Sequence, residues 1–305
     1  MERHIIGAIG DIDDTMIPWE VPHSRAYPAM SAALSRVSGL PEDQIISDIK
    51  QVNTKYGTIE YTALIQEMPS FQKLSPARQK KLVEVAIKSR RAAIEGLTTP
   101  FPDIDVLLHT LNYNGLIQVA LSDAPVNLAY LRLKRERLLD YFDLVAGSPS
   151  PDDSLFAPEH RMGNKKYLVP VKTVETKKPF ADLSKLLNLT PEQIRDRYFL
   201  YGNSEHSDQG EARRNGMLFY QTNWDRGTQE MRDILLKYAP ERVLAGNVGT
   251  KAADGIETHP DFEMVKVNSA MEMIEDLQRR RIIKELPPAL TSGLPRRYNR
   301  PPPPF

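Results

Sequence analysis

The amino-acid sequence predicts an α/β fold with a three-layer, Rossmann-like core, in which helices cover both faces of a parallel sheet. Two observations predict this core: short apolar segments recur along the chain, and helical patterns separate them. A third observation adds an inserted α-helical unit. Apolar residues recur at spacings of three and four throughout residues 24–97, between the first and second predicted strands.

The first predicted strand is 5–9, an apolar run without alternation that ends at Gly10 and Asp11. Such a run is typical of a strand that is buried on both faces of a parallel sheet. The same pattern predicts strands at 116–121, 144–146, 198–201, 217–220 and 262–267. Because the carboxyl ends of parallel strands share one edge of the sheet, polar residues at those ends are expected to meet there.

Helical periodicity separates the predicted strands. It covers 104–112, 128–138, 180–187, 209–215 and 270–281. Within the insertion, Pro41 and Pro76 lie at predicted first helical turns, where proline is favoured. The polar stretch 148–176 includes an alternating segment, 167–173, which is typical of a hairpin strand.

These patterns divide the chain into three parts. Residues 1–17 and 101–285 are predicted to form the core, and residues 18–100 the helical insertion. Residues 286–305 are rich in proline and arginine and cannot bury a core, which predicts a disordered or polyproline II tail.

The composition excludes several function classes. The 305 residues include 40 Lys and Arg and 40 Asp and Glu, so no overall field favours a nucleic acid or an anionic membrane. The absence of cysteine excludes a disulfide scaffold, a thiolate nucleophile and a cysteine-ligated metal. No apolar run reaches the ~18 residues of a membrane helix, and the N-terminal run is too short for a secretory signal. We therefore expect no membrane partner and a cytoplasmic location.

Three acidic residues follow the first predicted strand. Asp11, Asp13 and Asp14 are close in sequence, and strand alternation places Asp11 and Asp13 on the same side of the chain. Carboxylates at this spacing repel one another, and a hard divalent cation such as Mg²⁺ relieves the repulsion and also binds phosphate. The alternative is a solvated turn or a helix cap, because acidic residues are common in both.

Polar residues recur at three later points of the pattern. Ser122 ends the second strand, Lys177-Lys178-Pro179 precedes a helix, and Gly202-Asn203-Ser204, with Asp208 beyond it, follows the fourth strand. Together with Asp11-Ile12-Asp13-Asp14-Thr15, this order resembles the haloacid dehalogenase (HAD) superfamily. The four loops of that family carry DxDx[T/V], a Ser or Thr, a Lys often followed by Pro, and an acidic GDxxxD-type end.

The resemblance covers roughly residues 5–220, and two connecting segments strengthen it. The segment from Arg132-Leu133 to Phe142-Asp143 is similar to the RLxxxGLxxYFD connection of many members. The segment from Glu211-Ala212 to Gly216 is similar to the DxxAAxxAG that follows the fourth loop. The helical insertion matches the position and size of the family's C1-type cap, which closes over the site and selects the substrate.

The resemblance implies a Mg²⁺-dependent phosphatase that hydrolyses a phosphate monoester of a small molecule through an aspartyl-phosphate. Asp11 would be the nucleophile, Asp13 the general acid and base, and Lys178 the cation that holds phosphate beside Asp11. The resemblance places Thr15, Ser122 and Asp123 at the substrate. It assigns Mg²⁺ binding to Asp11, Asp13, Asn203 and Asp208.

Each later residue also has a structural interpretation. Ser122 alone is typical of a turn or a helix cap, Lys178 of a solvated surface, and Asp208 of the acidic first turn of a helix. The sequence also departs from the family at Asn203, where an Asp is usual, because an amide oxygen brings no charge to a metal. Further departures are the length of 148–176, which we expect to form a flap near the site, and the addition after residue 222.

Several alternatives stay open. A phosphomutase differs only in the group that attacks the aspartyl-phosphate. A kinase or sugar-nucleotide transferase with a DxD metal site lacks support, because no Gly-rich phosphate loop is present. Asp13 disfavours a dehalogenase, because the resemblance implies that the dehalogenases of the superfamily have no acid–base Asp two residues after the nucleophile. The non-enzymatic alternative is a HAD-like scaffold whose proline-rich tail binds a proline-recognition domain.

The insertion contains polar candidates for substrate contact. They are His23, Lys55, Tyr56 and Arg90. All four residue types are ordinary on an exposed helical surface, so the sequence selects none of them. The specificity of the site is therefore open at this stage.

Overall fold

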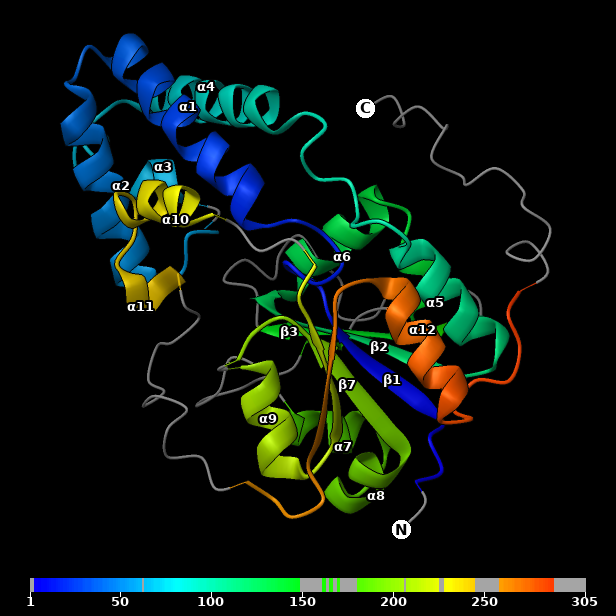
Figure 1. Cartoon of the computed structure of the whole chain (residues 1–305). Helices are drawn as coiled ribbons and strands as arrows, with labels where there is room; N and C mark the ends of the chain where they lie inside the picture. The colour runs from blue at the N-terminus through cyan, green and yellow to red at the C-terminus, as the bar shows by residue number, and fades with distance from the viewer. Residues whose placement is uncertain are drawn as a thin grey trace.

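The computed structural model describes residues 3–61, 63–148, 161–162, 165–166, 169–170, 180–205, 207–224, 228–244 and 258–287. A seven-stranded sheet lies at its centre, and every neighbouring pair of these strands is parallel (Figure 1). In sheet order the strands are β6 (Val169–Pro170), β3 (Leu144–Ser148), β2 (Ile117–Pro125), β1 (Gly7–Asp11), β7 (Tyr198–Gly202), β8 (Leu218–Thr222) and β9 (Glu263–Val267). Strand β1, which ends at Asp11, is the middle strand.

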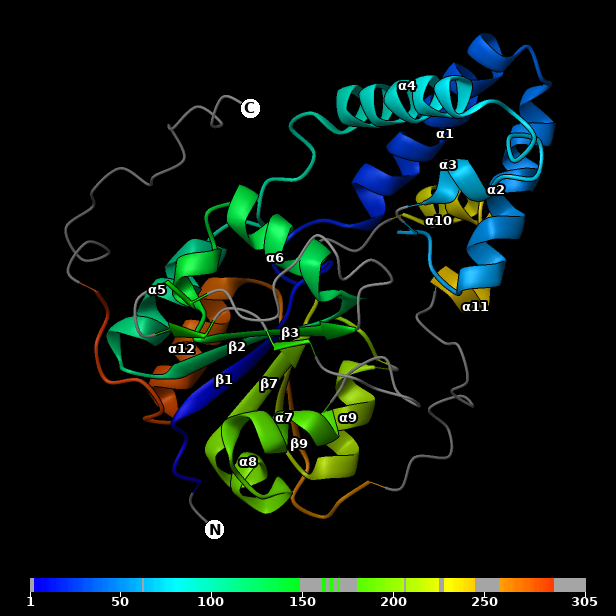
Figure 2. The ribbon, with the colours of Figure 1, turned by 180° about the vertical axis from the view of Figure 1, so that it is seen from behind.

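Helices cover both faces of the sheet, as the three-layer prediction requires. α5 (Ile104–Tyr113), α6 (Val126–Arg135) and α12 (Ala270–Arg279) lie over one face. α7 (Phe180–Leu187), α8 (Pro191–Arg197) and α9 (Asp208–Asn215) lie over the other face (Figure 2). A short helical turn, η1 (Leu139–Tyr141), leads into β3.

Alternation along the strands builds a separate hydrophobic core on each face. In β1, Ala8 belongs to the cluster beneath α5 and α12, whereas Ile9 packs with Leu183 of α7 and Ile194 of α8. All four side chains are at most 1% exposed. Full burial of a large apolar side chain stabilises a fold by about 1.5 to 3 kcal/mol, so both faces contribute to holding β1 in the middle of the sheet.

The insertion between β1 and β2 is helical. It contains α1 (Glu20–Ser38), α2 (Glu42–Tyr56), α3 (Leu64–Glu67) and α4 (Pro76–Ile94), with α1 and α4 packed along each other (Figure 1). Gly39 ends α1 at φ 79°, a left-handed conformation that glycine adopts without strain. Pro76 lies in the first turn of α4, as predicted. We call this insertion the cap.

A segment that the sequence analysis grouped with the core contributes to the cap. α10 (Gln229–Leu236) and α11 (Glu241–Leu244) follow β8 and lie beside α1 and α2 in both views (Figures 1 and 2). Leu235 and Tyr238 join the buried cluster of the cap. The carbonyl of Tyr238 accepts a hydrogen bond from Asn53 Nδ2 at 3.0 Å, and its hydroxyl lies 3.0 Å from Ser31 Oγ. The cap is therefore assembled from two separate stretches of the chain.

The insertion between β1 and β2 is joined to the core by two segments that are tied to each other. The chain leaves the core at 17–19 and returns to it at 95–101. The N–H of Phe101 donates to the carbonyl of Met16 at 3.0 Å, which ties the outgoing and returning segments together. This pairing fixes where the cap begins relative to the residues that follow β1.

The elements predicted from the sequence are confirmed, with ends that differ by a few residues. Helices α8, α10 and α11 were not predicted. The predicted hairpin strand is corrected, because its residues 169–170 pair in parallel with β3 and extend the main sheet. A separate antiparallel pair forms instead between β4 (Arg161–Met162) and β5 (Lys165–Lys166). Among the described helices, none is both long and apolar enough to cross a bilayer.

The predicted flap at 148–176 and the predicted tail at 286–305 lie for the most part outside the described residues.

Candidate active site

Three loops at the carboxyl edge of the sheet bring predicted site residues together. Asp11 is the last residue of β1, Ser122 lies in β2, and Asn203 directly follows β7. Strand β1 pairs with both β2 and β7, so these three positions meet although they are far apart in the sequence. The open edge of a parallel sheet is where such folds bind ligands.

Residues 12–17 form a compact turn directly after β1. The N–H groups of Met16 and Ile17 donate to the carbonyl of Ile12 at 2.9 and 3.0 Å. Asp14 stands at φ 54°, a left-handed conformation that Asp tolerates better than most residues do. The turn brings Thr15 back towards Asp11, and Thr15 Oγ1 donates a hydrogen bond to Asp11 Oδ2 at 2.9 Å.

Thr15 is buried and links two of the loops. Its Oγ1 lies 3.4 Å from Asn203 Oδ1, in addition to its hydrogen bond to Asp11. Its carbonyl accepts a hydrogen bond from Trp224 Nε1 at 2.7 Å. The carboxylate of Asp11, which is 5% exposed, and the amide oxygen of Asn203 therefore approach the same hydroxyl group.

Asp13 is held by two side chains that come from β2 and α6. Ser122 Oγ donates to Asp13 Oδ2 at 3.2 Å, and Arg132 Nη1 donates to Asp13 Oδ1 at 2.5 Å. Ser122 Oγ also accepts a hydrogen bond from the N–H of Ala124 at 3.1 Å. Both carboxylate oxygens of Asp13 are thus engaged, and the side chain keeps 22% of its surface exposed.

Asp208 is fully buried at the start of α9. Its Oδ2 accepts a hydrogen bond from the N–H of Ser204 at 3.0 Å, which closes the loop after β7. Gly202 makes this approach possible. A Cβ on Gly202 would lie 2.2 Å from Asp208 Oδ2, so only glycine fits beside this carboxylate.

The remaining predicted residues show fewer contacts with these loops or lie outside the described residues. Asp123 follows Ser122 on β2 and is partly buried. Lys178 lies outside the described residues, so its predicted contact with phosphate and Asp11 stays a prediction. Of the polar cap candidates, Lys55 forms an exposed ion pair with Glu67 at 2.9 Å.

Burial shifts the pKa values of two titratable groups near Asp11. It raises the pKa of Asp14 to about 7, although the N–H groups of Trp19 and Glu20 donate to its Oδ1 and act in the opposite direction. Burial, aided by the nearby Asp11 carboxylate, also raises the pKa of Tyr201 well above its usual range. Tyr201 therefore stays neutral, and its ring occupies the space that a side chain at Gly10 would need.

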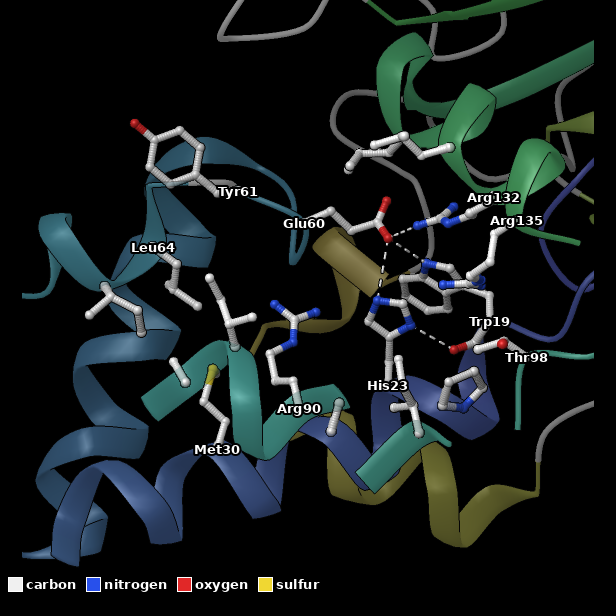
Figure 3. A pocket seen from close by; sticks show the side chains of 18 of the residues that line it. Trp19, His23, Met30, Glu60, Tyr61, Leu64, Arg90, Thr98, Arg132 and Arg135 are labelled. Atoms are coloured by element: carbon white, nitrogen blue, oxygen red, sulfur yellow. Dashed lines mark hydrogen bonds and ion pairs between the residues drawn. The ribbon is translucent and has the colours of Figure 1, made fainter. Parts of the chain in front are cut away.

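Arg132 connects the turn at residues 12–17 to the cap. Its Nη1 atom binds Asp13. Its Nη2 atom binds Glu60, in the loop between α2 and α3 (Figure 3). Glu60 Oε1 also accepts a hydrogen bond from Trp19 Nε1 at 3.2 Å. Because the side chains of Arg132 and Glu60 are only 13% and 8% exposed, this bridge is poorly screened by solvent.

His23 belongs to the same group of side chains. Its Nδ1 donates to the carbonyl of Trp19 at 2.8 Å, and its Nε2 lies 3.3 Å from Glu60 Oε1. The second spacing would suit an ion pair if the imidazole were protonated. Burial, together with the nearby guanidinium groups of Arg90 and Arg132, lowers the pKa of His23 to about 3. His23 is therefore neutral near pH 7 and adds no positive charge.

A cavity of about 450 Å³ lies between the cap and α6, next to this bridge (Figure 3). Its walls come from α1, α4, α6 and the segment around Glu60. They include His23 and Arg90, two of the polar cap residues that the sequence could not select. Ile17 and Arg132 also line it, so the cavity begins where the turn at residues 12–17 ends.

The donors at the sheet edge suit a hard cation. Among the described residues, no three His, Asp or Glu side chains converge as a metal cluster. The oxygen atoms that approach one hydroxyl group are instead the Asp11 carboxylate and the Asn203 amide oxygen, and Asp208, the first residue of α9, is hydrogen-bonded to the loop that contains Asn203. A set made only of carboxylate and amide oxygens favours Mg²⁺ over softer metals, and the amide supplies no charge.

Four contact residues were not predicted as site residues. Arg132 appeared only as part of a connecting segment, and nothing in the local sequence marked Glu60, Trp19 or Trp224. Each belongs to a different segment, and only the packing of separate segments brings these side chains near the turn at residues 12–17.

Comparison with solved structures identifies the fold. A haloacid dehalogenase-like family hydrolase from Xanthomonas campestris matches with a TM-score of 0.51 and 13% identity, over 91% of this chain and 96% of that chain. A HAD family hydrolase from Deinococcus radiodurans matches with a TM-score of 0.45 and 12% identity, over 92% and 98%. A haloacid dehalogenase-like hydrolase from Streptococcus pneumoniae matches with a TM-score of 0.44 and 15% identity, over 90% and 99%. No protein-family model and no curated protein sequence matches the chain.

The match to the Xanthomonas structure establishes that this chain has the haloacid dehalogenase-like fold, in agreement with the sequence resemblance.

Proposed function

We propose that this protein is a Mg²⁺-dependent phosphatase that hydrolyses a phosphate monoester of a small molecule. One observation carries the proposal. On a haloacid dehalogenase-like fold, Asp11 ends the middle strand, while Asp13 and Ser122 lie within hydrogen-bond distance of each other directly beyond it. Two carboxylates with different surroundings are what a nucleophile and a separate acid–base group require.

In the first half-reaction, a carboxylate oxygen of Asp11 attacks phosphorus. The bond between phosphorus and the ester oxygen breaks, and Asp13 in its acid form gives that oxygen a proton, so that an alcohol leaves. The product is an aspartyl-phosphate on Asp11. Thr15 orients the attacking carboxylate through its hydrogen bond to Oδ2.

In the second half-reaction, water attacks the phosphorus of the aspartyl-phosphate. Asp13, now a carboxylate, takes a proton from that water, and the bond between phosphorus and the Asp11 oxygen breaks. Inorganic phosphate leaves and the Asp11 carboxylate is restored. Ser122, whose hydroxyl donates to Asp13 in this structure, turns its proton towards a phosphoryl oxygen when the phosphate is bound.

Mg²⁺ would be held by Asp11, Asn203, Asp208 and the backbone carbonyl of Asp13, and would supply positive charge that offsets the repulsion between phosphate and Asp11. Lys178 is proposed as a further source of that charge. The oxygen-only donor set supports the choice of metal.

The test measures phosphate release from an aryl phosphate and from a panel of phosphorylated sugars, nucleotides and amino acids. We expect release in the presence of Mg²⁺, loss of release in EDTA, and loss of at least a thousandfold in kcat for Asp11→Asn, because a carboxamide cannot act as the nucleophile. Asp140→Asn, at an exposed position remote from these loops, is the matched control and should keep wild-type turnover.

A second readout identifies the intermediate. With the aryl phosphate, whose phenolate can leave without a proton from Asp13, the Asp13→Asn variant can still form the intermediate but has no group that activates water, so a covalent phosphate should accumulate on the peptide that contains Asp11 and be visible by mass spectrometry. Turnover that persists in Asp11→Asn, with a folded protein, would refute the proposed nucleophile.

A further inference from the structure

The cavity between the cap and α6 is built from side chains that point to a particular kind of ligand. Its walls are mostly apolar and include Met30, Leu64 and Val83 from the cap and Leu128 and Leu131 from α6. Its volume of about 450 Å³ lies within the range typical of small-molecule sites. A ligand in this cavity must therefore present an apolar body to most of the wall.

The charged side chains in the wall are unequal in sign. They are Glu60, Arg90, Arg132 and Arg135, whereas His23 is neutral near pH 7. Three guanidinium groups thus accompany one carboxylate. Carboxylates outside the wall also pair with some of these guanidinium groups, so the wall favours an anionic ligand only through a guanidinium group that has no such partner.

Two of the three guanidinium groups already have carboxylate partners. Arg132 binds Asp13 and Glu60. Arg135 is the last residue of α6, and its Nε lies 2.6 Å from Oε1 of Glu136, the next residue. These two side chains are held in place by protein groups before any ligand arrives.

Arg90 differs from them. In the described part of the chain, no carboxylate lies within ion-pair distance of its guanidinium group, which instead lies over the ring of Tyr27 at 5.5 Å from the ring centroid. Figure 3 shows the Arg90 guanidinium directed into the cavity, across from Glu60 and Arg132. A cation in a mostly apolar wall gains most from an anionic ligand that reaches it, because burial removes the water that would otherwise solvate the charge.

We propose that Arg90 binds a second anionic group of the substrate, so that the substrate is a phosphate monoester with an apolar body and a carboxylate at its far end. This inference rests on the proposed phosphatase function, because it places the phosphate at Asp11. Arg132 contacts Asp13 on one side and lines the cavity on the other, so the body of the substrate extends from Asp11 past Arg132 into the cavity.

The test compares two series of esters that differ only at the far end. One series is phosphate monoesters of straight-chain hydroxycarboxylic acids, and the other is the corresponding carboxamides, each in several chain lengths. For the best length, we expect wild-type kcat/KM to be about 10- to 100-fold higher for the carboxylate, the range typical of a charge-assisted contact. Equal values for the two series at every length would overturn the proposal.

Three variants assign the preference to one side chain. Arg90→Met keeps an apolar stem of similar length and should abolish the preference for the carboxylate, measured as the ratio of kcat/KM between the two series. Arg90→Lys keeps the charge and should retain part of the preference. Arg91→Met, at the exposed neighbouring position on α4, is the matched control and should keep the full preference. A preference that survives in Arg90→Met would overturn the role of Arg90.

A binding measurement separates this inference from the proposed function. If no ester is hydrolysed, the phosphatase proposal fails, and calorimetric binding of straight-chain carboxyalkylphosphonates and their carboxamides tests the cavity alone. Tighter binding of the carboxylate to wild type than to Arg90→Met supports the anion site. Equal binding of both probes to both proteins overturns it.

Discussion

At the scale of single residues, Asp14 shows how the turn after β1 constrains the first helix of the cap. Its Oδ1 accepts hydrogen bonds from the N–H groups of Trp19 and Glu20 at 2.7 and 3.3 Å, where α1 begins. An acidic side chain at this place satisfies helix N–H groups that have no partner within the helix. Asp14 is partly buried at this place, and the resulting loss of solvation opposes ionisation of its carboxyl group.

The shift in the pKa of Asp14 predicts a pH dependence of stability. The pKa is about 7 in the folded protein against the ordinary value of 3.8, so between these values the folded state binds more protons than the unfolded state. The free energy of unfolding should therefore fall as the pH rises from about 4 to about 7. Urea unfolding at about pH 5 and about pH 8, with a chelator present, measures this fall.

Asp14→Asn is the matched variant for this prediction. Asparagine also tolerates a positive φ and offers the same acceptor to Trp19 and Glu20, but it cannot ionise. The variant should show a smaller fall in the free energy of unfolding over the same interval. Identical slopes for the variant and the wild type would contradict the assignment of this effect to Asp14.

At the scale of elements, the central feature is the bridge from α6 through Arg132 to Glu60 in the cap. Arg132 is the one described side chain that binds both Asp13 and a cap residue. Helix α6 packs in the core and also forms part of the cavity wall. It therefore links the position of the cap to the position of Asp13. A change in the position of the cap therefore changes the contacts of Arg132, and with them the placement of Asp13.

A double-mutant cycle between Arg132 and Glu60 tests this bridge. For stability, Arg132→Met and Glu60→Gln should be non-additive by about 0.5 to 3 kcal/mol, because each removes the other's partner. Arg135→Met, one turn further along α6, pairs with Glu136 rather than Glu60 and should be additive with Glu60→Gln. Additivity of the Arg132 pair would show that the bridge contributes nothing to the folded state.

Measurements of kcat distinguish the contribution of Arg132 from that of Glu60. Arg132→Met removes a partner of Asp13, whereas Glu60→Gln leaves the contact between Arg132 and Asp13 in place. We expect Arg132→Met to lower kcat more than Glu60→Gln does. A larger loss in Glu60→Gln would indicate that the cap contact matters more than the placement of Asp13.

At the scale of the whole molecule, the cap is stabilised by a segment that belongs to the second half of the chain. Leu235 is 2% exposed and packs within the cap cluster, although β8 and β9 on either side of its segment belong to the sheet. The cap therefore depends on a connection between two sheet strands, and the two parts of the molecule are linked through more than the paired segments at 17–19 and 95–101.

Substitution of Leu235 tests this dependence. Leu235→Ala should destabilise the cap by about 2 to 5 kcal/mol, because it leaves a cavity in a buried cluster. Hydrogen exchange should then increase in α1 and α2 more than in β1 and β7. Leu111→Ala, at a buried position of α5 in the core, is the matched control and should show the opposite pattern. If Leu235→Ala increased hydrogen exchange equally in the cap helices and the core strands, cap and core would unfold together.

The sequence by itself determined the sheet, the helical insertion and the order of the polar loops. Buried parallel strands are continuous apolar runs, so β1, β2 and β7 could be recognised locally, and with them the positions of Asp11, Ser122 and Asn203 at one sheet edge. The contacts between Thr15, Asp11 and Asn203 agree with that expectation. The roles given to these residues stay proposals, as does that of Lys178.

Only the tertiary structure decided which residues join the cap to the site. α10 and α11 are short, and their apolar side chains do not reveal which of two hydrophobic clusters they enter. Arg90, Arg132 and Glu60 are charged residues on helices and a loop, a pattern shared with any solvated surface. Their burial, pairing and orientation arise when separate segments pack together, and that information is not contained in the spacing of residues within any one segment.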